Sequence, residues 1–284
     1  MEIAEAYQFI WVNPEGLHSS FNAGDESCCG YALERGVDDK AFFRSIIQEL
    51  AATTHHRFVS ADWVYALGWS NGGYMISAAA DLFRAIAPIA GYQIEKVALQ
   101  RPTALFLHHA QDDPMVQSTG CCTDSSMPHC CCQISLHLDT CTSVESQVAR
   151  WASNNACSSS SSSSSNNIIS LHIPDEMTCY TYEGCQANTT YCMHQHKGHF
   201  NRPNFPTAFS YSGQIADFFA HHMCTTASPG AIWDSSQRHC RCPLTSSQQQ
   251  QQQQGAIYCS TGINSPSDIP TTSTHEETNT MVIP

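Results

Sequence analysis

The 284-residue chain carries 12 Lys and Arg against 25 Asp and Glu, a formal net charge of −13 at pH 7. A chain this acidic, without a basic cluster, is a poor partner for nucleic acid or an anionic membrane surface. No apolar run approaches the roughly 20 residues of a membrane span. We therefore expect one α/β domain with a tail, and neither nucleic acid nor a membrane among its partners.

The chain contains 16 cysteines, several of them adjacent, as at 28–29, 121–122 and 130–132. An even number of cysteines in polar, loop-like sequence favours disulfides and an oxidising, extracellular compartment. No cysteine pair has the Cys-x-x-Cys spacing of a zinc knuckle, so we expect no metal and no other cofactor. The sequon Asn188-Thr189-Thr190 agrees with secretion.

The first residues, Met1 to Ala6, lack the basic region and apolar core of a secretory signal. We therefore expect the chain to be a fragment, or its start to be misassigned.

Apolar periodicity and turn residues predict the elements in chain order. The expected strands are residues 8–12, 63–67, 85–90, 104–109 and 168–173. The expected helices are residues 74–85, a helix around 144–151, a helix that begins at Asp38-Asp39 and a helix that ends near His221-His222. Residues 3–7 are expected to be the end of a further helix. This alternation predicts an α/β fold with a mainly parallel sheet flanked by helices. The serine run 158–165 is typical of a mobile loop.

A change of composition divides the chain at about residue 224. Residues 1–224 form the predicted domain, and residues 225–284 contain a glutamine run and a Ser/Thr/Pro-rich end. We expect this tail to be largely disordered, apart from a small disulfide knot formed by Cys240, Cys242 and Cys259.

The segment Gly68-Trp69-Ser70-Asn71-Gly72 joins a predicted strand to a predicted helix. Gly-x-Ser-x-Gly in this context is typical of a nucleophile elbow, whose serine adopts a strained backbone and is crowded by any side chain at the two glycines. Ser70 is therefore the candidate nucleophile. The alternative is a glycine-rich turn with an incidental serine.

A serine hydroxyl becomes a strong nucleophile only when a base takes its proton and an acid orients the base. The order Ser70, then Asp112 or Asp113, then His199 is that of α/β-hydrolases. We favour Asp113 as the acid, because the sequence after it fits Asp-x-x-Val, and expect Asp112 to hydrogen-bond the turn. The backbone N–H of Asn71 is the expected oxyanion donor, whereas no His-Gly pair for the second donor precedes Ser70.

Several segments beyond the elbow resemble the secreted polyhydroxybutyrate depolymerase and feruloyl esterase family of α/β-hydrolases. They are Phe21-Asn22-Ala23-Gly24 with Cys28-Cys29-Gly30, Val37-Asp38-Asp39, Ala87-Pro88-Ile89-Ala90-Gly91, Asp113-Pro114-Met115-Val116 and Gly198-His199-Phe200-Asn201. The resemblance covers roughly residues 3–224.

This resemblance implies an α/β-hydrolase fold and a serine esterase with Ser70 as nucleophile, Asp113 as acid and His199 as base. It implies paired cysteines around Cys28-Cys29 and within 121–141, and it matches a Trp…Asn-x-Cys stretch at Trp151, Asn155 and Cys157. Family members begin with several strands and a His-Gly loop, so it also implies that this chain is missing its first strands.

The leading hypothesis is a secreted serine carboxylic-ester hydrolase whose substrate is a feruloyl-polysaccharide or polyhydroxyalkanoate-type ester. One alternative is a catalytically inactive hydrolase-fold protein that binds a wall or polymer. A third hypothesis, a metal-dependent hydrolase, would use His194, His196 and His199.

Overall fold

A computed structural model of the chain describes residues 7, 9–24, 30–53, 63–92, 99–120, 143–158, 168–173, 177–200, 209–227, 232–234, 239–241 and 280–283. Its strands are β1 (Ile10–Val12), β2 (Tyr65–Trp69), β3 (Ala85–Ile89), β4 (Ala104–Ala110), β5 (Ile168–Ile173), β6 (Met177–Tyr182), β7 (Thr189–His194), β8 (Ile232–Asp234), β9 (His239–Arg241) and β10 (Thr280–Ile283). Its helices are α2 (Tyr31–Glu34), α3 (Asp39–Thr53), α4 (Asn71–Ala78), α5 (Val144–Asn154) and α6 (Phe209–Ala227), with 3-10 turns η1 (Leu17–Ser19) and η2 (Ala80–Leu82).

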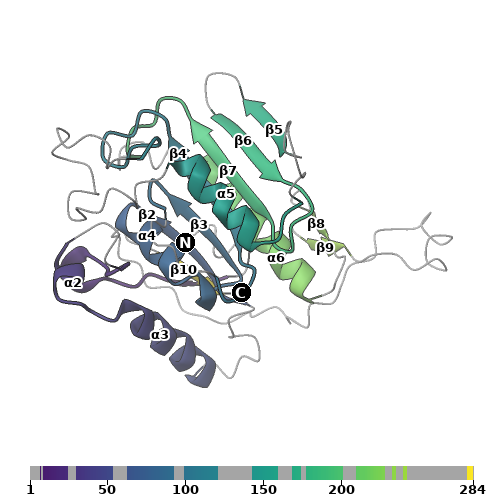
Figure 1. Cartoon of the computed structure of the whole chain (residues 1–284). Helices are drawn as coiled ribbons and strands as arrows, with labels where there is room; N and C mark the ends of the chain where they lie inside the picture. Colours follow the sequence, from purple (N-terminus) through teal and green to yellow (C-terminus); the bar gives the residue numbers. More distant parts are fainter. Residues whose placement is uncertain are drawn as a thin grey trace, which may run out of the picture.

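The centre of the molecule is an eight-stranded sheet in the order β1-β10-β2-β3-β4-β7-β6-β5 (Figure 1). The four central strands β2, β3, β4 and β7 are parallel, and antiparallel strands extend the sheet on both sides. The predicted α/β fold with a parallel central sheet and flanking helices is confirmed. Parallel strands bring their carboxyl ends to one edge, where the loops of such sheets gather functional groups.

Helices cover both faces of this sheet. Ala66, Ile86 and Leu105 belong to the core cluster that contains residues of α4 and α5. Their neighbours Tyr65, Ala87 and Ala104 belong to the cluster on the other face, with residues of α6. Because successive side chains of a strand point to opposite faces, burial on both sides requires the near-continuous apolar runs seen in β2 and β3.

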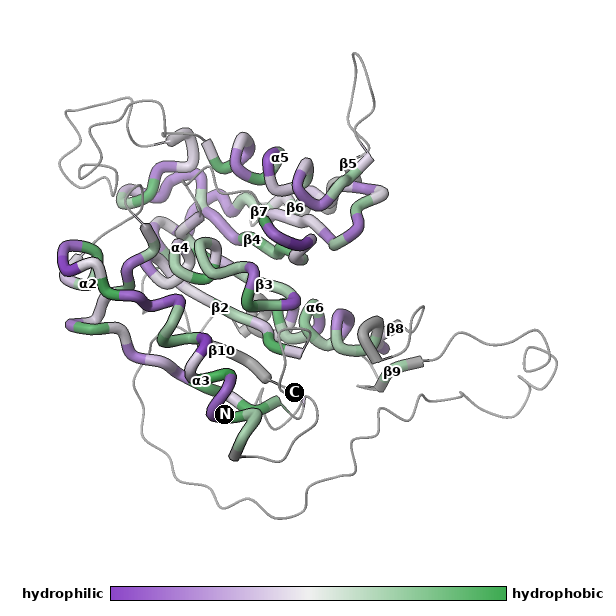
Figure 2. Tube along the Cα trace, turned by 60° about the horizontal axis from the view of Figure 1, so that its bottom comes forward, coloured by the Kyte–Doolittle hydropathy of each residue, from purple (hydrophilic) through white to green (hydrophobic). Residues whose placement is uncertain are grey.

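Helices α3 and α5 each have an apolar face and a polar face, and Figure 2 shows hydrophilic and hydrophobic residues along both. In α3, Phe43 is buried in the core while its neighbour Phe42 is 40% exposed. In α5, the side chain of Ser143 caps the first turn by accepting a hydrogen bond from the backbone N–H of Ser146. Such a cap satisfies a donor that the helix leaves without an internal partner.

The structure corrects several predicted boundaries. The strand predicted at 63–67 is β2, two residues later, and the helix predicted at 74–85 begins at Asn71 and ends at Ala78, followed by η2. Helix α6 continues past His221-His222 to Ala227.

Strands β6 and β7 were not predicted. Their sequences, Met-Thr-Cys-Tyr-Thr-Tyr and Thr-Thr-Tyr-Cys-Met-His, are too polar to be recognised as a buried apolar run. The strand that precedes His199 is therefore β7 rather than β5.

The predicted tail contains the last residues of α6 and the strands β8, β9 and β10. Strands β8 and β9 form a two-stranded sheet, and β10 lies between β1 and β2 in the main sheet. A disulfide joins Cys224 at the end of the domain to Cys240 in β9. Cys242 and Cys259 of the predicted knot lie outside the described residues.

All six cysteines that the structure describes are paired: Cys157–Cys185, Cys179–Cys192 and Cys224–Cys240. Disulfides of this number are compatible with an extracellular protein. The cysteines at 28–29 and 121–141, and the serine run from residue 159, lie outside the described residues.

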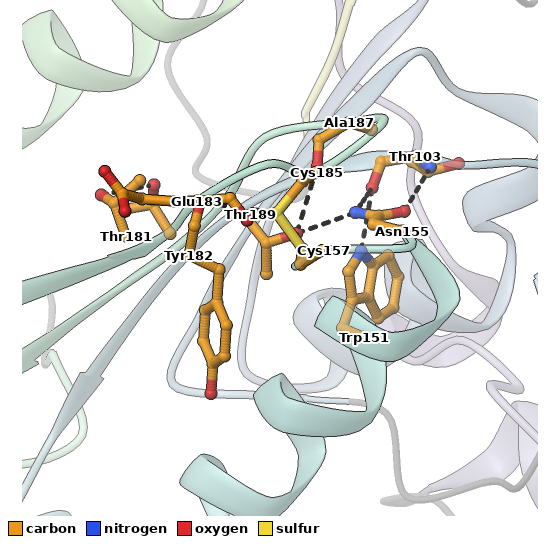
Figure 3. Close-up of a disulfide and its surroundings, with 11 residues drawn as sticks. Thr103, Trp151, Asn155, Cys157, Thr181, Tyr182, Glu183, Cys185, Ala187 and Thr189 are labelled. Atoms are coloured by element: carbon orange, nitrogen blue, oxygen red, sulfur yellow. Dashed lines mark hydrogen bonds between the residues drawn. A yellow bond between two sulfur atoms is a disulfide. The ribbon is translucent and has the colours of Figure 1, made fainter. Parts of the chain in front are cut away.

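The Cys157–Cys185 disulfide lies beside a buried polar cluster that joins three elements (Figure 3). Asn155 accepts a hydrogen bond from Thr103 N–H and donates to Thr103 O and Thr189 Oγ1. The indole N–H of Trp151 also donates to Thr103 O, at 2.9 Å. The hydrogen bonds of this cluster link the end of α5 to the amino ends of β4 and β7.

Within the described ranges, the structure contains no helix of sufficient length and apolarity to span a membrane.

Candidate active site

Ser70 occupies a sharp turn between β2 and α4, with φ 54° and ψ −121°. A positive φ is strained for a residue with a side chain, and such strain concentrates at functional sites. The turn closes so tightly that a Cβ at Gly68 would overlap the backbone carbonyl of Gly72. The N–H of Ser70 donates to Ile89 O in β3 at 2.8 Å. The predicted elbow geometry is therefore present.

The structure brings Ser70, Asp113 and His199 together in one hydrogen-bonded chain. His199 Nε2 lies 2.8 Å from Ser70 Oγ, and His199 Nδ1 lies 3.0 and 2.9 Å from the two carboxylate oxygens of Asp113. A carboxylate only accepts, so Nδ1 carries the proton and Nε2 is left to accept the serine O–H. This is the tautomer that a general base requires.

These three residues come from the carboxyl ends of three parallel strands. Ser70 follows β2, Asp113 follows β4 and His199 lies five residues after β7. The parallel sheet thus brings together side chains that are 86 and 129 residues apart in the sequence. Only Ser70 is half-buried, whereas the side chains of His199 and Asp113 are 9% and 0% exposed.

The carboxylate of Asp113 is held by its own turn. Its Oδ1 accepts hydrogen bonds from the backbone N–H groups of Met115 and Val116, at 2.8 and 2.9 Å. These donors orient the carboxylate toward the imidazole. The Asp-x-x-Val pattern that favoured Asp113 corresponds to this turn.

Asp112 takes a different place. It is exposed, and its Oδ1 accepts hydrogen bonds from the backbone N–H groups of Lys197 and Gly198, at 3.1 and 2.9 Å. The expectation that it would hydrogen-bond its own turn is wrong. Asp112 instead joins the turn of Asp113 to the loop that carries His199.

Trp69 supports His199 from the other side, a contact that the sequence analysis missed. Its indole N–H donates to His199 O at 2.9 Å, and the two ring centroids are 5.2 Å apart. Gly198 adopts φ +53°, in the region that glycine tolerates best. The position of Trp69, next to the nucleophile in the elbow, was the available signal.

His109 supports the turn of Asp113 and was also missed. This fully buried residue faces Val116 O with Nε2 at 2.7 Å, and the same atom is 3.9 Å from Asp113 Oδ2. A carbonyl only accepts, so Nε2 carries the proton. Burial lowers the pKa of His109 below its usual value, which keeps the ring neutral.

Asn71, the expected oxyanion donor, is the first residue of α4. Its side chain pairs with both backbone groups of Phe21: Oδ1 accepts from the N–H at 2.7 Å and Nδ2 donates to the carbonyl at 3.0 Å. The segment after η1 therefore packs against the helix end beside Ser70. Because the Phe21 N–H is occupied by Asn71, it is not available as the second oxyanion donor.

The histidines of the metal hypothesis are not brought together. His194 Nε2 lies 3.1 Å from His108 Nδ1, His199 faces Ser70 and Asp113, and His196 is exposed. Within the described ranges of the chain, no three His, Cys, Asp or Glu side chains are grouped in a way that could hold a metal ion. Burial, with a smaller contribution from Lys197, lowers the pKa of His194 to about 4.

Comparison with protein-family models, curated proteins and solved structures finds no match. A functional interpretation of the chain therefore depends on the geometry of this site and on its motifs.

Proposed function

We propose that this protein is a serine carboxylic-ester hydrolase with the α/β-hydrolase fold, in which Ser70 is the nucleophile, His199 the base and Asp113 the acid. The observation that carries the proposal is the hydrogen-bonded chain from Ser70 Oγ through both ring nitrogens of His199 to the buried Asp113 carboxylate. A base–nucleophile distance of 2.8 Å lies within the range that proton transfer requires.

The first half of the reaction forms an acyl-enzyme. Ser70 Oγ attacks the ester carbonyl carbon while its proton moves to His199 Nε2, and Asp113 stabilises the imidazolium. The tetrahedral oxyanion is expected near the start of α4, where Asn71 N–H can donate to it. His199 then returns the proton to the leaving alkoxide as the carbon–oxygen bond breaks.

The second half releases the acid. His199 Nε2 takes a proton from water, the resulting hydroxide attacks the acyl carbon, and collapse of the intermediate expels Ser70 Oγ. His199 gives that proton back to Ser70, which restores the resting enzyme. Neither half requires a metal ion or another cofactor.

The substrate class comes from the resemblance to the polyhydroxybutyrate depolymerase and feruloyl esterase family: a feruloyl ester of a polysaccharide or a polyhydroxyalkanoate-type ester. Secretion is supported by the three disulfides. The alternative of an inactive, polymer-binding protein is disfavoured because the three side chains retain productive distances.

Removal of the nucleophile tests the proposal. Ser70→Ala should lower kcat for a p-nitrophenyl ester by on the order of 10⁴-fold or more. Ser45→Ala, at an exposed position of α3, is the matched control and should be unaffected. Hydrolysis by Ser70→Ala at the wild-type rate would refute the mechanism, and polymer binding by a wild-type protein without hydrolysis would favour the inactive alternative.

A further inference from the structure

One motif of the sequence takes no part in the proposed site. Asn188-Thr189-Thr190 has the Asn-x-Thr pattern of an N-glycosylation acceptor. Such a pattern is common by chance and indicates a modified residue only where the asparagine is accessible. The structure supplies that information.

Asn188 is exposed and directly precedes β7. Its backbone carbonyl accepts a hydrogen bond from Leu105 N–H at 2.8 Å, which fixes the main chain at the start of β4. In the part of the chain that the structure describes, its side-chain amide makes no hydrogen bond to protein. The amide nitrogen is therefore presented to solvent from a firmly held backbone.

The surroundings of Asn188 are rigid. Cys185, three residues earlier, is joined to Cys157, and Gln186 N–H donates to Asn155 O at 2.8 Å. Thr189, the next residue, is fully buried and bonded to Asn155 (Figure 3). A group attached to the exposed Asn188 would consequently leave the surface without displacing core side chains.

Asn188 lies at the sheet edge opposite the proposed active site. Thr189 is aligned with Leu105 at the amino ends of β7 and β4, whereas His194 is aligned with Ala110 at the carboxyl ends, beside the Asp113 turn. The six residues of β7 separate the two edges by about 20 Å at about 3.3 Å per residue. An attached oligosaccharide would therefore leave the approach to Ser70 clear.

We propose that Asn188 carries an N-linked oligosaccharide on the sheet edge opposite Ser70. Its Nδ2 forms a bond to the anomeric carbon of a lipid-pyrophosphate-linked oligosaccharide, the anomeric carbon–oxygen bond breaks, the lipid pyrophosphate leaves, and the amide proton passes to a base. Thr190 Oγ1 is hydrogen-bonded to Thr181 in the folded sheet, at 3.0 Å. The attachment therefore precedes the pairing of β6 with β7, while the threonine hydroxyl is still accessible.

Mass measurement of the full chain, directed into the secretory pathway of a eukaryotic host, tests this proposal. The secreted wild type should lose the mass of one oligosaccharide on treatment with peptide N-glycosidase, and mapping should place the deamidated residue at 188. Asn188→Gln and Thr190→Ala should show no loss, whereas Thr190→Ser, which keeps the hydroxyl, should retain it. A wild-type protein that is secreted with its disulfides formed but without a removable oligosaccharide would overturn the proposal.

A separate activity measurement tests the position of the oligosaccharide. Enzymatic removal of the sugar from folded wild type should leave ester hydrolysis unchanged, because Asn188 and Ser70 lie at opposite edges. A large change in rate on removal would contradict the placement. The mass readout does not depend on the esterase proposal, so the failure of either inference leaves the other testable.

Discussion

Two adjacent aspartates support His199 in different ways. Asp113 faces the imidazole with both oxygens, whereas Asp112 holds the backbone of the His199 loop. The two residues have the same chemistry and neighbouring positions, and only the direction in which each side chain points separates their roles.

This difference predicts unequal effects of the same substitution. Asp113→Asn places an amide opposite Nδ1 and favours the wrong tautomer, a change that lowers kcat by about 10⁴ in a studied serine protease. Asp112→Asn keeps an acceptor for the two N–H groups and removes only its charge, so we expect a loss of about tenfold, since a charge-assisted hydrogen bond contributes about 1–1.5 kcal/mol more than a neutral one. Steady-state kinetics on a p-nitrophenyl ester measures both, and a larger effect at Asp112 would reverse the assignment.

The residues around the triad differ in how well the sequence predicts them. Ser70 and Asp113 belong to local patterns whose geometry follows from a turn, and His199 follows from chain order. Trp69 and His109 act through contacts with loops that are distant in the sequence, or through a carbonyl that a turn presents. The position of Trp69 beside Ser70 was a local signal, but the partners of Trp69 and His109 became visible only in the folded chain.

At the scale of elements, hydrogen bonds from the end of α5 stabilise the amino edge of the sheet. Asn155 is fully buried and satisfies the N–H and carbonyl of Thr103 as well as the hydroxyl of Thr189. Its amide thus links the two strands just before their backbone pairing, which begins at Leu105 and Thr189.

Asn155→Ala should lower the free energy of unfolding by about 2–4 kcal/mol, because several buried polar groups lose their partners together. Asn154→Ala, a half-buried position one residue earlier, is the matched control and should change stability by about 0.5 kcal/mol or less. Urea denaturation compares the two. Equal effects would show that the buried cluster does not stabilise the fold.

Buried histidines on β4, β7 and α6 predict loss of stability in acid. Burial lowers the pKa of His194 to about 4 and of His222 to about 3, and lowers the pKa of His108 and His109 as well. An unfolded histidine titrates near pH 6.5, so the unfolded state binds more protons between that pH and the folded pKa. The stability that these neutral rings contribute is therefore fully present above about pH 6.5, and it is lost as the pH drops toward 4.

For His194 alone this loss amounts to at most about 3 kcal/mol. Urea midpoints measured from pH 8 to pH 4 should decrease below about pH 6.5, and His194→Gln should flatten part of the slope. A midpoint that rises on acidification would contradict the buried, neutral state of these rings.

Strands were predictable where both faces are covered. Strands β2, β3 and β4 have the apolar runs that such burial requires, whereas β6 and β7 alternate threonine, tyrosine and cysteine. The disulfide between the paired residues Cys179 and Cys192 joins these two strands within a small buried cluster that also contains Met177. Hydrophobic periodicity alone therefore underestimates this side of the sheet.

At the scale of the whole molecule, strand β10 joins distant parts of the chain. It pairs antiparallel with β1 on one side and with β2, the strand before Ser70, on the other. Its sequence, Thr-Met-Val-Ile, suits a strand but follows a long polar segment, so composition alone assigned it to the tail.

This arrangement predicts that β10 stabilises the sheet. Val282 is aligned with Trp11 and Tyr65, and Val282→Pro would remove a ladder donor at a cost of about 1–3 kcal/mol for the acceptor left unsatisfied. Val282→Thr keeps the backbone donor and is the control. Thermal unfolding should separate the two variants, and identical melting temperatures would show that β10 contributes little.

The central claim is that the fold brings Ser70 to a base that makes it a nucleophile, and covalent labelling tests it most directly. A serine-directed phosphonate should add one adduct to the wild-type chain, mapped by mass spectrometry to the peptide that contains Ser70. Ser70→Ala should remain unlabelled, and His199→Ala should be labelled far more slowly. Ester hydrolysis by a chain that takes up no label at Ser70, or label placed on another residue, would contradict the account.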